Sequence, residues 1–124
     1  MKILVTGYKG FIGSRLFDDL RYEQNYGYGV EGLDRPEDIG NWVAPSGMFA
    51  KHYDCIIHLA SISNDPMAEI DKNLSWETSA LGTMQLMNFA LKRKIKRIIY
   101  ASSGSVYGIK KEKKVTENLS LKPI

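Results

Sequence analysis

Cysteine is almost missing from this sequence, in which Cys55 is the only one among 124 residues. An intrachain disulfide and a cysteine metal cluster are therefore excluded, we expect no metal site, and a single thiol suits a reducing compartment. Long hydrophobic runs are missing too, because the apolar run near the N-terminus is far too short for a signal peptide or a membrane span. These absences predict a cytoplasmic protein with no membrane partner.

A strong excess of charge is also missing, since 17 basic residues stand against 14 acidic ones for a net charge of +3. Such a small excess does not by itself indicate nucleic-acid binding, and we expect no nucleic-acid partner. The basic residues do cluster in 92–97 and 110–114. A solvated helix end and a surface loop explain both clusters, and a docking patch for a phosphate or an acidic partner is the alternative.

The remaining composition is that of an ordinary globular domain, with 44% hydrophobic and 25% charged residues. The length fits one domain over residues 1–124 that can bury a core without disulfides. Apolar runs predict strands at 2–6, 30–33, 53–60 and 97–102, and helical spacing predicts amphipathic helices at 11–22 and 73–93. Pro36 and Pro45 could each open a short helix within 35–52.

Strands and helices alternate along the chain, and the predicted strands are apolar on both faces. A strand that is apolar on both faces belongs inside a parallel sheet with helices on either side. The pattern therefore predicts an α/β fold of right-handed βαβ units. After Gly108 we expect mostly loop.

A GxxGxxG string, formed by Gly7, Gly10 and Gly13, joins the first predicted strand to the first helix. The first glycine permits the tight turn, the second lets a pyrophosphate approach the backbone, and the third lets helix and strand pack closely. Asp34 follows the next strand, where its carboxylate can accept both ribose hydroxyls of an adenosine and would repel a 2′-phosphate. This context predicts a dinucleotide site with a preference for NAD, and a purely structural glycine turn is the alternative.

Further motifs follow in order: residues 58–61 (His-Leu-Ala-Ser), the Gly82-Thr83 pair, and residues 101–108 (Ala-Ser-Ser-Gly-Ser-Val-Tyr-Gly). Together with the glycine string and Asp34, they resemble the extended short-chain dehydrogenase/reductases, in particular the nucleotide-sugar epimerases and dehydratases. The resemblance covers the whole chain. It implies a Rossmann-like domain, bound NAD, and chemistry at C4 of a hexose linked to a nucleotide.

The resemblance also assigns residues by position. It implies that the pyrophosphate is held by Gly7, Gly10, Phe11, Ile12 and Gly13, the adenosine by Asp34, Arg35, Asp38 and Ile39, and the nicotinamide half by Leu59, Ala60 and Ser61. Ser103 matches the catalytic serine or threonine that hydrogen-bonds the reacting sugar oxygen. A loop serine that caps the strand end is the alternative for Ser103.

The chain departs from the family pattern at three places. Ser79 stands where many members have an asparagine, and a serine keeps one hydrogen bond but not two. The interval from Asp34 to Asp54 is short, so one strand and helix would be reduced or missing. The helix that bears the family's catalytic Tyr-x-x-x-Lys pair is not in the sequence. The spacing occurs only at Tyr107 and Lys111, and Gly108, directly after the tyrosine, is a poor helix residue, so we expect no catalysis from this pair.

These features predict the N-terminal, NAD-binding portion of such an enzyme, truncated before the catalytic helix and the C-terminal substrate part and inactive alone. Whether the chain is an enzyme stays open, and a free-standing dinucleotide-binding or interaction module is the alternative. A nucleotide-sugar substrate is expected only if the missing part is supplied.

Three smaller expectations concern the core and the surface. His58 is expected to be a neutral core residue and Cys55 an inert buried thiol. We expect a homodimer or other self-association through an exposed surface around Trp76, Met84, Met87 and 97–102.

Overall fold

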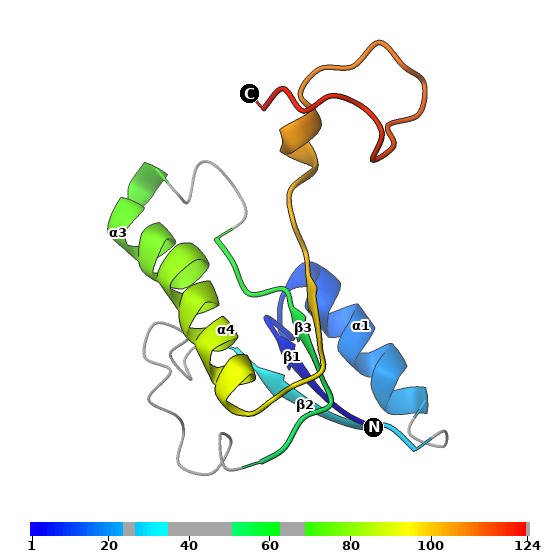
Figure 1. The fold of residues 1–124 in the computed structure, drawn as a ribbon, viewed down its shortest axis with the longest axis vertical. Coiled ribbons are helices and arrows are strands. Elements are labelled where there is room, and N and C mark those ends of the chain that lie inside the picture. The colour runs from blue at the N-terminus through cyan, green and yellow to red at the C-terminus, as the bar shows by residue number, and fades with distance from the viewer. Residues whose placement is uncertain (24–26, 35–50, 63–68, 124) are drawn as a thin grey trace.

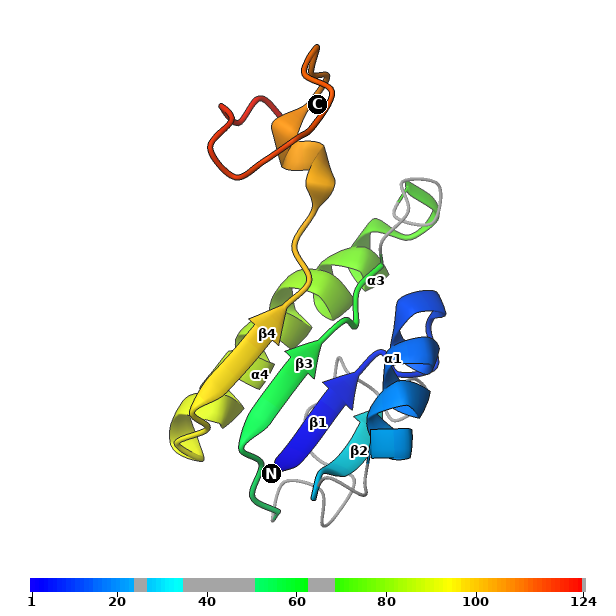
Figure 2. The same cartoon turned by 90° about the vertical axis from the view of Figure 1, so that its right-hand side faces the viewer.

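Four strands form one parallel sheet in the computed structural model, which describes residues 1–23, 27–34, 51–62 and 69–123. The strands are β1 (Lys2–Thr6), β2 (Gly29–Leu33), β3 (Cys55–His58) and β4 (Arg97–Tyr100), and their order in the sheet is β2-β1-β3-β4. Leu4 pairs with Glu31 on one side and with Ile56 on the other, and Ile57 pairs with Ile99. All arrowheads point the same way (Figure 2), as the βαβ pattern predicts.

Helices cover both faces of the sheet, with α1 (Phe11–Tyr22) on one side and α4 (Gly82–Lys92) on the other (Figure 1). Successive residues of β1 enter different clusters: Leu4 packs in the cluster that holds Leu86 and Ala90 of α4, and Ile3 and Val5 pack in the cluster that Phe17 of α1 adjoins. This alternation follows from the two-residue period of a strand. The prediction of a sheet that is apolar on both faces is confirmed.

The predicted helix over 73–93 is present but interrupted. It consists of α3 (Lys72–Ser75), a π-helical stretch η3 (Trp76–Leu81) and α4. In the π stretch the N–H of Gly82 donates to the carbonyl of Glu77, five residues back. The Thr83 hydroxyl donates to the Ser79 carbonyl at 2.6 Å, and a hydroxyl that bonds four residues back competes with the regular helix ladder.

The start of α1 differs from the expected apolar face. Phe11 is 98% exposed and Ile12 is exposed as well, whereas Phe17 and Leu20 pack against the sheet. The helix begins beyond the end of β1, so its first turn reaches past the sheet (Figure 2). The helical spacing was right, but the core contact begins one turn later than the spacing alone suggested.

The chain beyond β4 leaves the sheet. A short 3₁₀ helix, η4 (Gly104–Tyr107), is followed by irregular backbone that stands apart from the sheet (Figure 1). This segment folds on itself, because the Lys122 N–H donates to the Val106 carbonyl at 2.9 Å and the Lys110 ammonium donates to the Ser120 carbonyl at 2.6 Å. The expected loop after Gly108 is thus observed over 109–123.

Two sequence expectations fall outside the described residues. One is the pair of short helices considered for 35–52, and the other is the reduced or missing strand and helix between Asp34 and Asp54. Both involve residues 35–50, which the structure does not describe. In the described ranges, no helix has the length and apolar character needed to cross a membrane.

Candidate functional site

The carboxyl ends of all four strands meet at one edge of the sheet (Figure 2). Gly7 follows β1, Asp34 follows β2, Leu59 follows β3 and Ala101 follows β4. The strand order reverses between β1 and β3, because one βα unit runs outward to β2 and the next ones run to β3 and β4. Ligands of open α/β sheets bind at such a switch point, beyond the carboxyl ends of the strands.

The glycine turn after β1 is held against both neighbouring strands. Gly7 has φ +73°, a conformation that favours glycine, and its N–H donates to the Leu33 carbonyl at 2.8 Å. A Cβ on Gly7 would lie 2.8 Å from the Ala60 nitrogen, so the turn and the 59–60 segment approach too closely for a side chain. The tight turn predicted at Gly7 is therefore present.

The start of α1 packs directly on this turn. A Cβ on Gly13 would lie 2.0 Å from the Gly7 carbonyl oxygen, which is the close packing that the sequence predicted for the third glycine. The first helical bond runs from the Ser14 N–H to the Gly10 carbonyl at 2.9 Å. Within the described residues no side chain caps this helix start, and its first turn has no acidic residue. Its N–H groups and dipole therefore favour an anion beside Gly10.

Asp34 lies beside the same turn. Its Oδ2 accepts the backbone N–H of Lys9 at 2.6 Å, which ties the end of β2 to the glycine string across 25 residues. The structure thus brings the predicted pyrophosphate residues and the predicted ribose carboxylate together. Arg35, Asp38 and Ile39, which the resemblance placed near the adenosine, lie outside the described residues.

The segment after β3, which the resemblance placed beside the nicotinamide half, is fixed by hydrogen bonds at both ends. The Leu59 N–H donates to the Thr6 carbonyl at 3.1 Å, and the Ile62 N–H donates to the Ser79 hydroxyl at 3.0 Å. Leu59 is half-buried, Ala60 is buried and Ser61 is exposed. The serine that replaces the family's asparagine therefore does make a hydrogen bond to the loop.

His58 is fully buried, as expected, and burial lowers its pKa to about 4, so the ring is neutral at physiological pH. Its Nδ1 lies 2.6 Å from the Thr6 hydroxyl and its Nε2 lies 2.8 Å from the Thr83 hydroxyl. The Tyr100 ring stacks on it at 5.5 Å. Sequence reasoning found the core position but missed these partners, which come from three separate elements. Cys55 is buried as expected, and burial raises the pKa of its thiol.

Ser103, the candidate catalytic residue, is exposed at the start of η4. Its hydroxyl accepts the Ser105 N–H at 3.2 Å and donates to the Ser105 hydroxyl at 3.0 Å. The helix ends at Tyr107, and Gly108 follows with φ +63°. Tyr107 and Lys111 therefore do not share a helix, in agreement with the expectation that their spacing is accidental.

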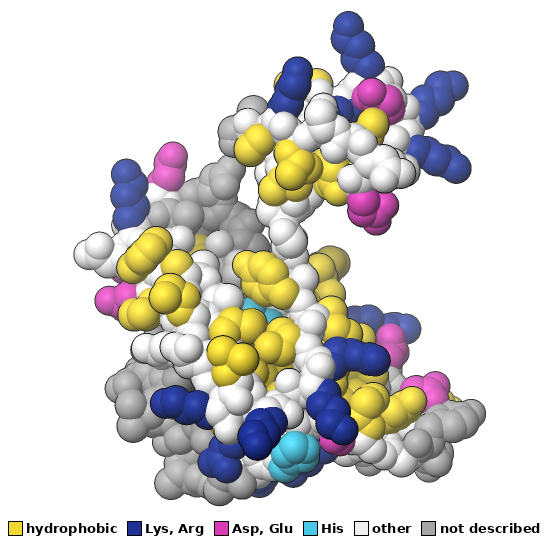
Figure 3. Space-filling view, in the orientation of Figure 1, with side chains coloured by type: hydrophobic (Ala, Val, Ile, Leu, Met, Phe, Trp, Pro, Cys, Tyr) yellow, Lys and Arg dark blue, Asp and Glu magenta, His cyan; other side chains and the backbone are white. Residues whose placement is uncertain are grey.

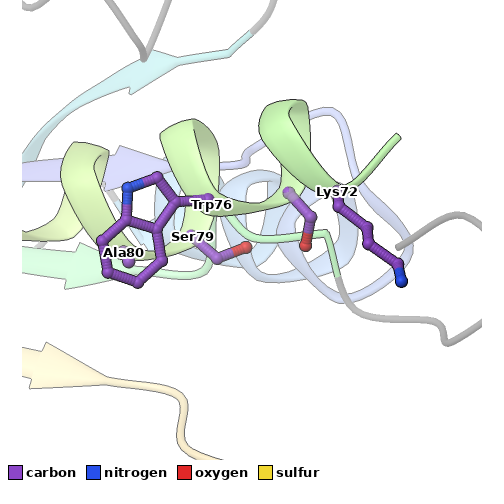
Figure 4. Close-up of a pocket in the computed structure, with 5 residues that line it drawn as sticks. Lys72, Trp76, Ser79 and Ala80 are labelled. Atoms are coloured by element: carbon purple, nitrogen blue, oxygen red, sulfur yellow. The ribbon is translucent and has the colours of Figure 1, made fainter. Parts of the chain in front are cut away.

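A shallow hollow of about 300 Å³ lies along α3 and η3. It is lined by Lys72, Ser75, Trp76, Ser79 and Ala80, whose side chains project from one side of the helix (Figure 4). No glycine-turn residue lines it. The hollow therefore adjoins the 59–62 segment through Ser79. It is separate from the start of α1 beside Gly10, which favours an anion and which we call the anion site.

The basic clusters do not gather into one patch. The 92–97 cluster lies at the end of α4 and the start of β4, and the 110–114 cluster lies in the C-terminal segment. Figure 3 shows cationic side chains at opposite ends of this face, with hydrophobic side chains between them. This separation favours two solvated surfaces over a single docking patch.

Comparisons with known proteins agree with this geometry. A family model described as "NAD dependent epimerase/dehydratase family" matches residues 3–124. A GDP-6-deoxy-D-talose 4-dehydrogenase from Aggregatibacter actinomycetemcomitans is 28% identical over 131 residues, which cover 100% of this chain and 42% of that protein.

Solved structures extend the comparison to cofactor complexes. UDP-glucuronic acid 4-epimerase from Bacillus cereus, in complex with UDP-glucuronic acid and NAD, superposes with a TM-score of 0.80 at 29% identity over 99% of this chain and 46% of its own. RMD from Pseudomonas aeruginosa, complexed with NADPH, superposes with a TM-score of 0.81 at 25% identity over 100% of this chain and 44% of its own. The chain spans less than half the length of these relatives.

Proposed function

Because the chain belongs to the NAD-dependent epimerase/dehydratase family, we propose that it forms the NAD-binding portion of a nucleotide-sugar epimerase or dehydratase of the extended short-chain dehydrogenase type. The observation that carries the proposal is the joint placement of the glycine turn and Asp34. The Asp34 carboxylate accepts the Lys9 N–H, so the anion site at the start of α1 and a ribose-binding carboxylate lie side by side. A dinucleotide presents a pyrophosphate next to a ribose, so one such ligand can contact both features.

The chain's own residues fit such a ligand. Gly10 is exposed and has no side chain, so a phosphate can reach the N–H groups of Phe11 and Ile12. Asp34 accepts hydroxyl donors of the adenosine ribose, and its negative charge disfavours a 2′-phosphate there. The backbone of Leu59 and Ala60 lies directly against the turn, because a Cβ on Gly7 would be 2.9 Å from the Leu59 carbonyl carbon and 2.8 Å from the Ala60 nitrogen. The bound cofactor supplies a hydride acceptor, which the protein side chains do not have.

Isothermal titration calorimetry with NAD and NADP tests this proposal on the 124-residue chain. We expect NAD to bind and NADP to bind at least tenfold more weakly, because the Asp34 carboxylate repels the 2′-phosphate of NADP. A tenfold difference in affinity corresponds to about 1.4 kcal/mol. Asp34→Asn should weaken the binding of NAD and reduce the difference in affinity between NAD and NADP. Gly10→Val should abolish the binding of both by blocking the approach of the pyrophosphate. Asp18→Asn, on the exposed side of α1, is the matched control and should leave both affinities unchanged. Equal affinity for NAD and NADP would contradict the assignment of Asp34.

A second part of the proposal concerns chemistry and partners. Ser103 follows β4 at the same edge of the sheet, so it can hydrogen-bond a sugar oxygen once a further polypeptide completes the site. The chain covers 42–46% of the relatives above, and a nucleotide sugar is proposed as substrate only in combination with the remainder. A free-standing dinucleotide-binding module is the alternative, and it predicts NAD binding with no gain of activity when any C-terminal polypeptide of a relative is added.

Self-association is the third part. α3, η3 and α4 together form what we call the long helix, on which Trp76 is 66% exposed and Met84 is 60% exposed. Ile99 and Tyr100 of β4 are about half exposed. Met87 does not belong to this surface, contrary to expectation, because it is partly buried against the core beside Leu86. A second copy of the chain is the proposed partner for the remaining surface.

A further inference from the structure

One polar network connects the ends of β1 and β3, which adjoin the candidate site, to the helix that covers them. It consists of Thr6 at the end of β1, His58 at the end of β3, and Thr83 and Ser79 on the long helix, and we call it the histidine network. Thr6 and His58 have no exposed surface. Buried polar groups are almost always hydrogen-bonded, because an unsatisfied one destabilises the folded state.

The direction of each hydrogen bond in the network follows from proton counting. The Thr83 hydroxyl has one proton, which it donates to the Ser79 carbonyl at 2.6 Å. Its oxygen must therefore accept from His58 at 2.8 Å, so Nε2 of the ring carries the proton. A neutral ring then has a bare Nδ1, which accepts the Thr6 hydroxyl proton at 2.6 Å. Thr6 in turn accepts the Ala60 N–H at 3.3 Å.

The two ends of this network hold the same loop. At one end the Thr6 hydroxyl oxygen accepts the Ala60 N–H, and at the other end the Ser79 hydroxyl accepts the Ile62 N–H at 3.0 Å. The network thus begins and ends on the segment 60–62. This segment faces Gly7 so closely that the turn leaves no space for a Cβ. A shift of the segment would therefore change the shape of the glycine turn.

We propose that His58 is a positioning residue for the cofactor site, which it serves as the Nε2–H tautomer by setting the 60–62 segment against the glycine turn through Thr6, Thr83 and Ser79. His58 does not touch the ligand in this role. It acts through Ala60 and Ile62, and the role rests on the proposed NAD site. The Tyr100 ring, stacked on the imidazole, extends the contact to the strand that leads to Ser103.

Nitrogen NMR of the ¹⁵N-labelled full chain tests the tautomer without any ligand. The chain has two histidines, His52 and His58, and only His58 is buried. We expect the buried His58 ring to show a protonated Nε2 and an unprotonated Nδ1 at neutral pH. A His58 ring protonated at Nδ1, or one that averages between the two tautomers, overturns the proposal whether or not NAD binds.

The conservative pair Thr83→Val and Thr83→Ser tests the positioning. The valine removes the hydroxyl and the serine keeps it, so only the valine should disturb the network. With Thr83→Val we expect amide exchange at Ala60 and Ile62 to rise about tenfold, and the dissociation constant for NAD to rise by a similar factor, as for the loss of one hydrogen bond. Thr83→Ser should keep both the amide exchange rates and the dissociation constant for NAD at their wild-type values.

The readouts separate this proposal from the proposed function. Unchanged amide exchange at Ala60 and Ile62 in a folded Thr83→Val variant overturns the positioning role, and so does faster exchange with unchanged NAD affinity. If the wild-type chain binds no NAD, the proposed function fails, and the positioning role for a cofactor fails with it, while the tautomer measurement still reports on the network itself. Thr6→Val, which removes the other hydroxyl, replaces Thr83→Val if that variant does not fold.

Discussion

Single glycines decide how closely the elements of the site approach one another. Gly7 and Gly13 each face backbone atoms rather than flexible side chains, so their surroundings cannot yield to an added methyl group. Gly32 is different, because its missing Cβ leaves room for the Tyr8 ring, whose nearest atom would lie 2.4 Å away. The site therefore depends on glycine for close contact between elements as well as for turn conformation.

Gly13→Ala separates packing from helix propensity. Propensity alone predicts that alanine stabilises α1 by about 1 kcal/mol. The added Cβ would lie 2.0 Å from the Gly7 carbonyl oxygen, so we expect a net loss of about 1–3 kcal/mol in the free energy of unfolding, measured by urea denaturation.

Gly29→Ala is the matched control for this change. Among the described residues, its Cβ would meet only the Lys2 side chain, at 3.8 Å, and the free energy of unfolding should stay the same or rise slightly. A Gly13→Ala protein as stable as the wild type would show that the turn and the helix can separate.

At the scale of elements, the strands β1 and β2 and the start of β3 are held by one cluster of polar side chains around Glu31. Lys2 and Lys51 each place Nζ 3.0 Å from its carboxylate, and the Tyr53 hydroxyl donates to it at 2.7 Å. Burial by itself raises the pKa of Glu31, but the hydrogen bonds from Tyr53, Lys2 and Lys51 outweigh it and lower the pKa to about 2. For Tyr53, burial and the bond to Glu31 raise the pKa of the phenol.

This cluster predicts an acid-dependent part of the stability. The Glu31 pKa falls from 4.5 to about 2 on folding, so its contribution is complete above pH 4.5 and is lost as the pH falls toward 2. The contribution is about 1–3 kcal/mol after allowance for solvent screening. Urea unfolding between pH 6 and pH 2.5 should show a shallower pH dependence for Glu31→Gln than for the wild type.

The control for this prediction is Glu77→Gln, an exposed carboxylate on the long helix. The free energy of unfolding of this variant should change with pH as that of the wild type does. If Glu31→Gln also follows the wild-type curve, the cluster around Glu31 does not stabilise the folded state through its charge.

At the scale of the whole molecule, the chain is expected to bind cofactor without turnover. Proton transfer by a positioned side chain contributes about 10²–10⁴-fold, and the only Tyr-x-x-x-Lys spacing, Tyr107 and Lys111, is split by the end of η4 at Gly108. UDP-, GDP- and dTDP-hexoses incubated with NAD and the 124-residue chain should give no product. Turnover that Tyr107→Phe abolishes would assign catalysis to Tyr107 after all.

Self-association also belongs to this scale. Trp76, Met84, Ile99 and Tyr100 expose apolar surface, and Figure 3 shows hydrophobic side chains gathered at the centre of one face. Light scattering should show a mass above 14.0 kDa that rises with concentration. Trp76→Ser together with Ile99→Lys should shift the equilibrium toward the monomer, with Phe11→Ser at the other side of the sheet as the control. A wild-type monomer at high concentration would exclude the proposed contact.

The sequence by itself determined the layers of the fold and the position of the glycine turn between β1 and α1. Short continuous apolar runs, helical spacing in 11–22 and 73–93, and glycines at fixed offsets are local signals, and each reflects a local steric or burial requirement. The strands, the two main helices, the turn at Gly7 and the close packing of Gly13 were therefore all predicted within a few residues.

Tertiary structure alone decided the contacts between distant segments. The bond of Asp34 to Lys9 joins residues 25 apart, and His58 bonds to Thr6 and Thr83 across 52 and 25 residues. No periodicity encodes such pairs, because they depend on how β1, β3 and the long helix meet in space. The π stretch at Trp76–Leu81 and the exposure of Phe11 are of the same kind. Local sequence sets which elements form, whereas the direction of a hydrogen bond or the depth of burial depends on the neighbours that folding brings together.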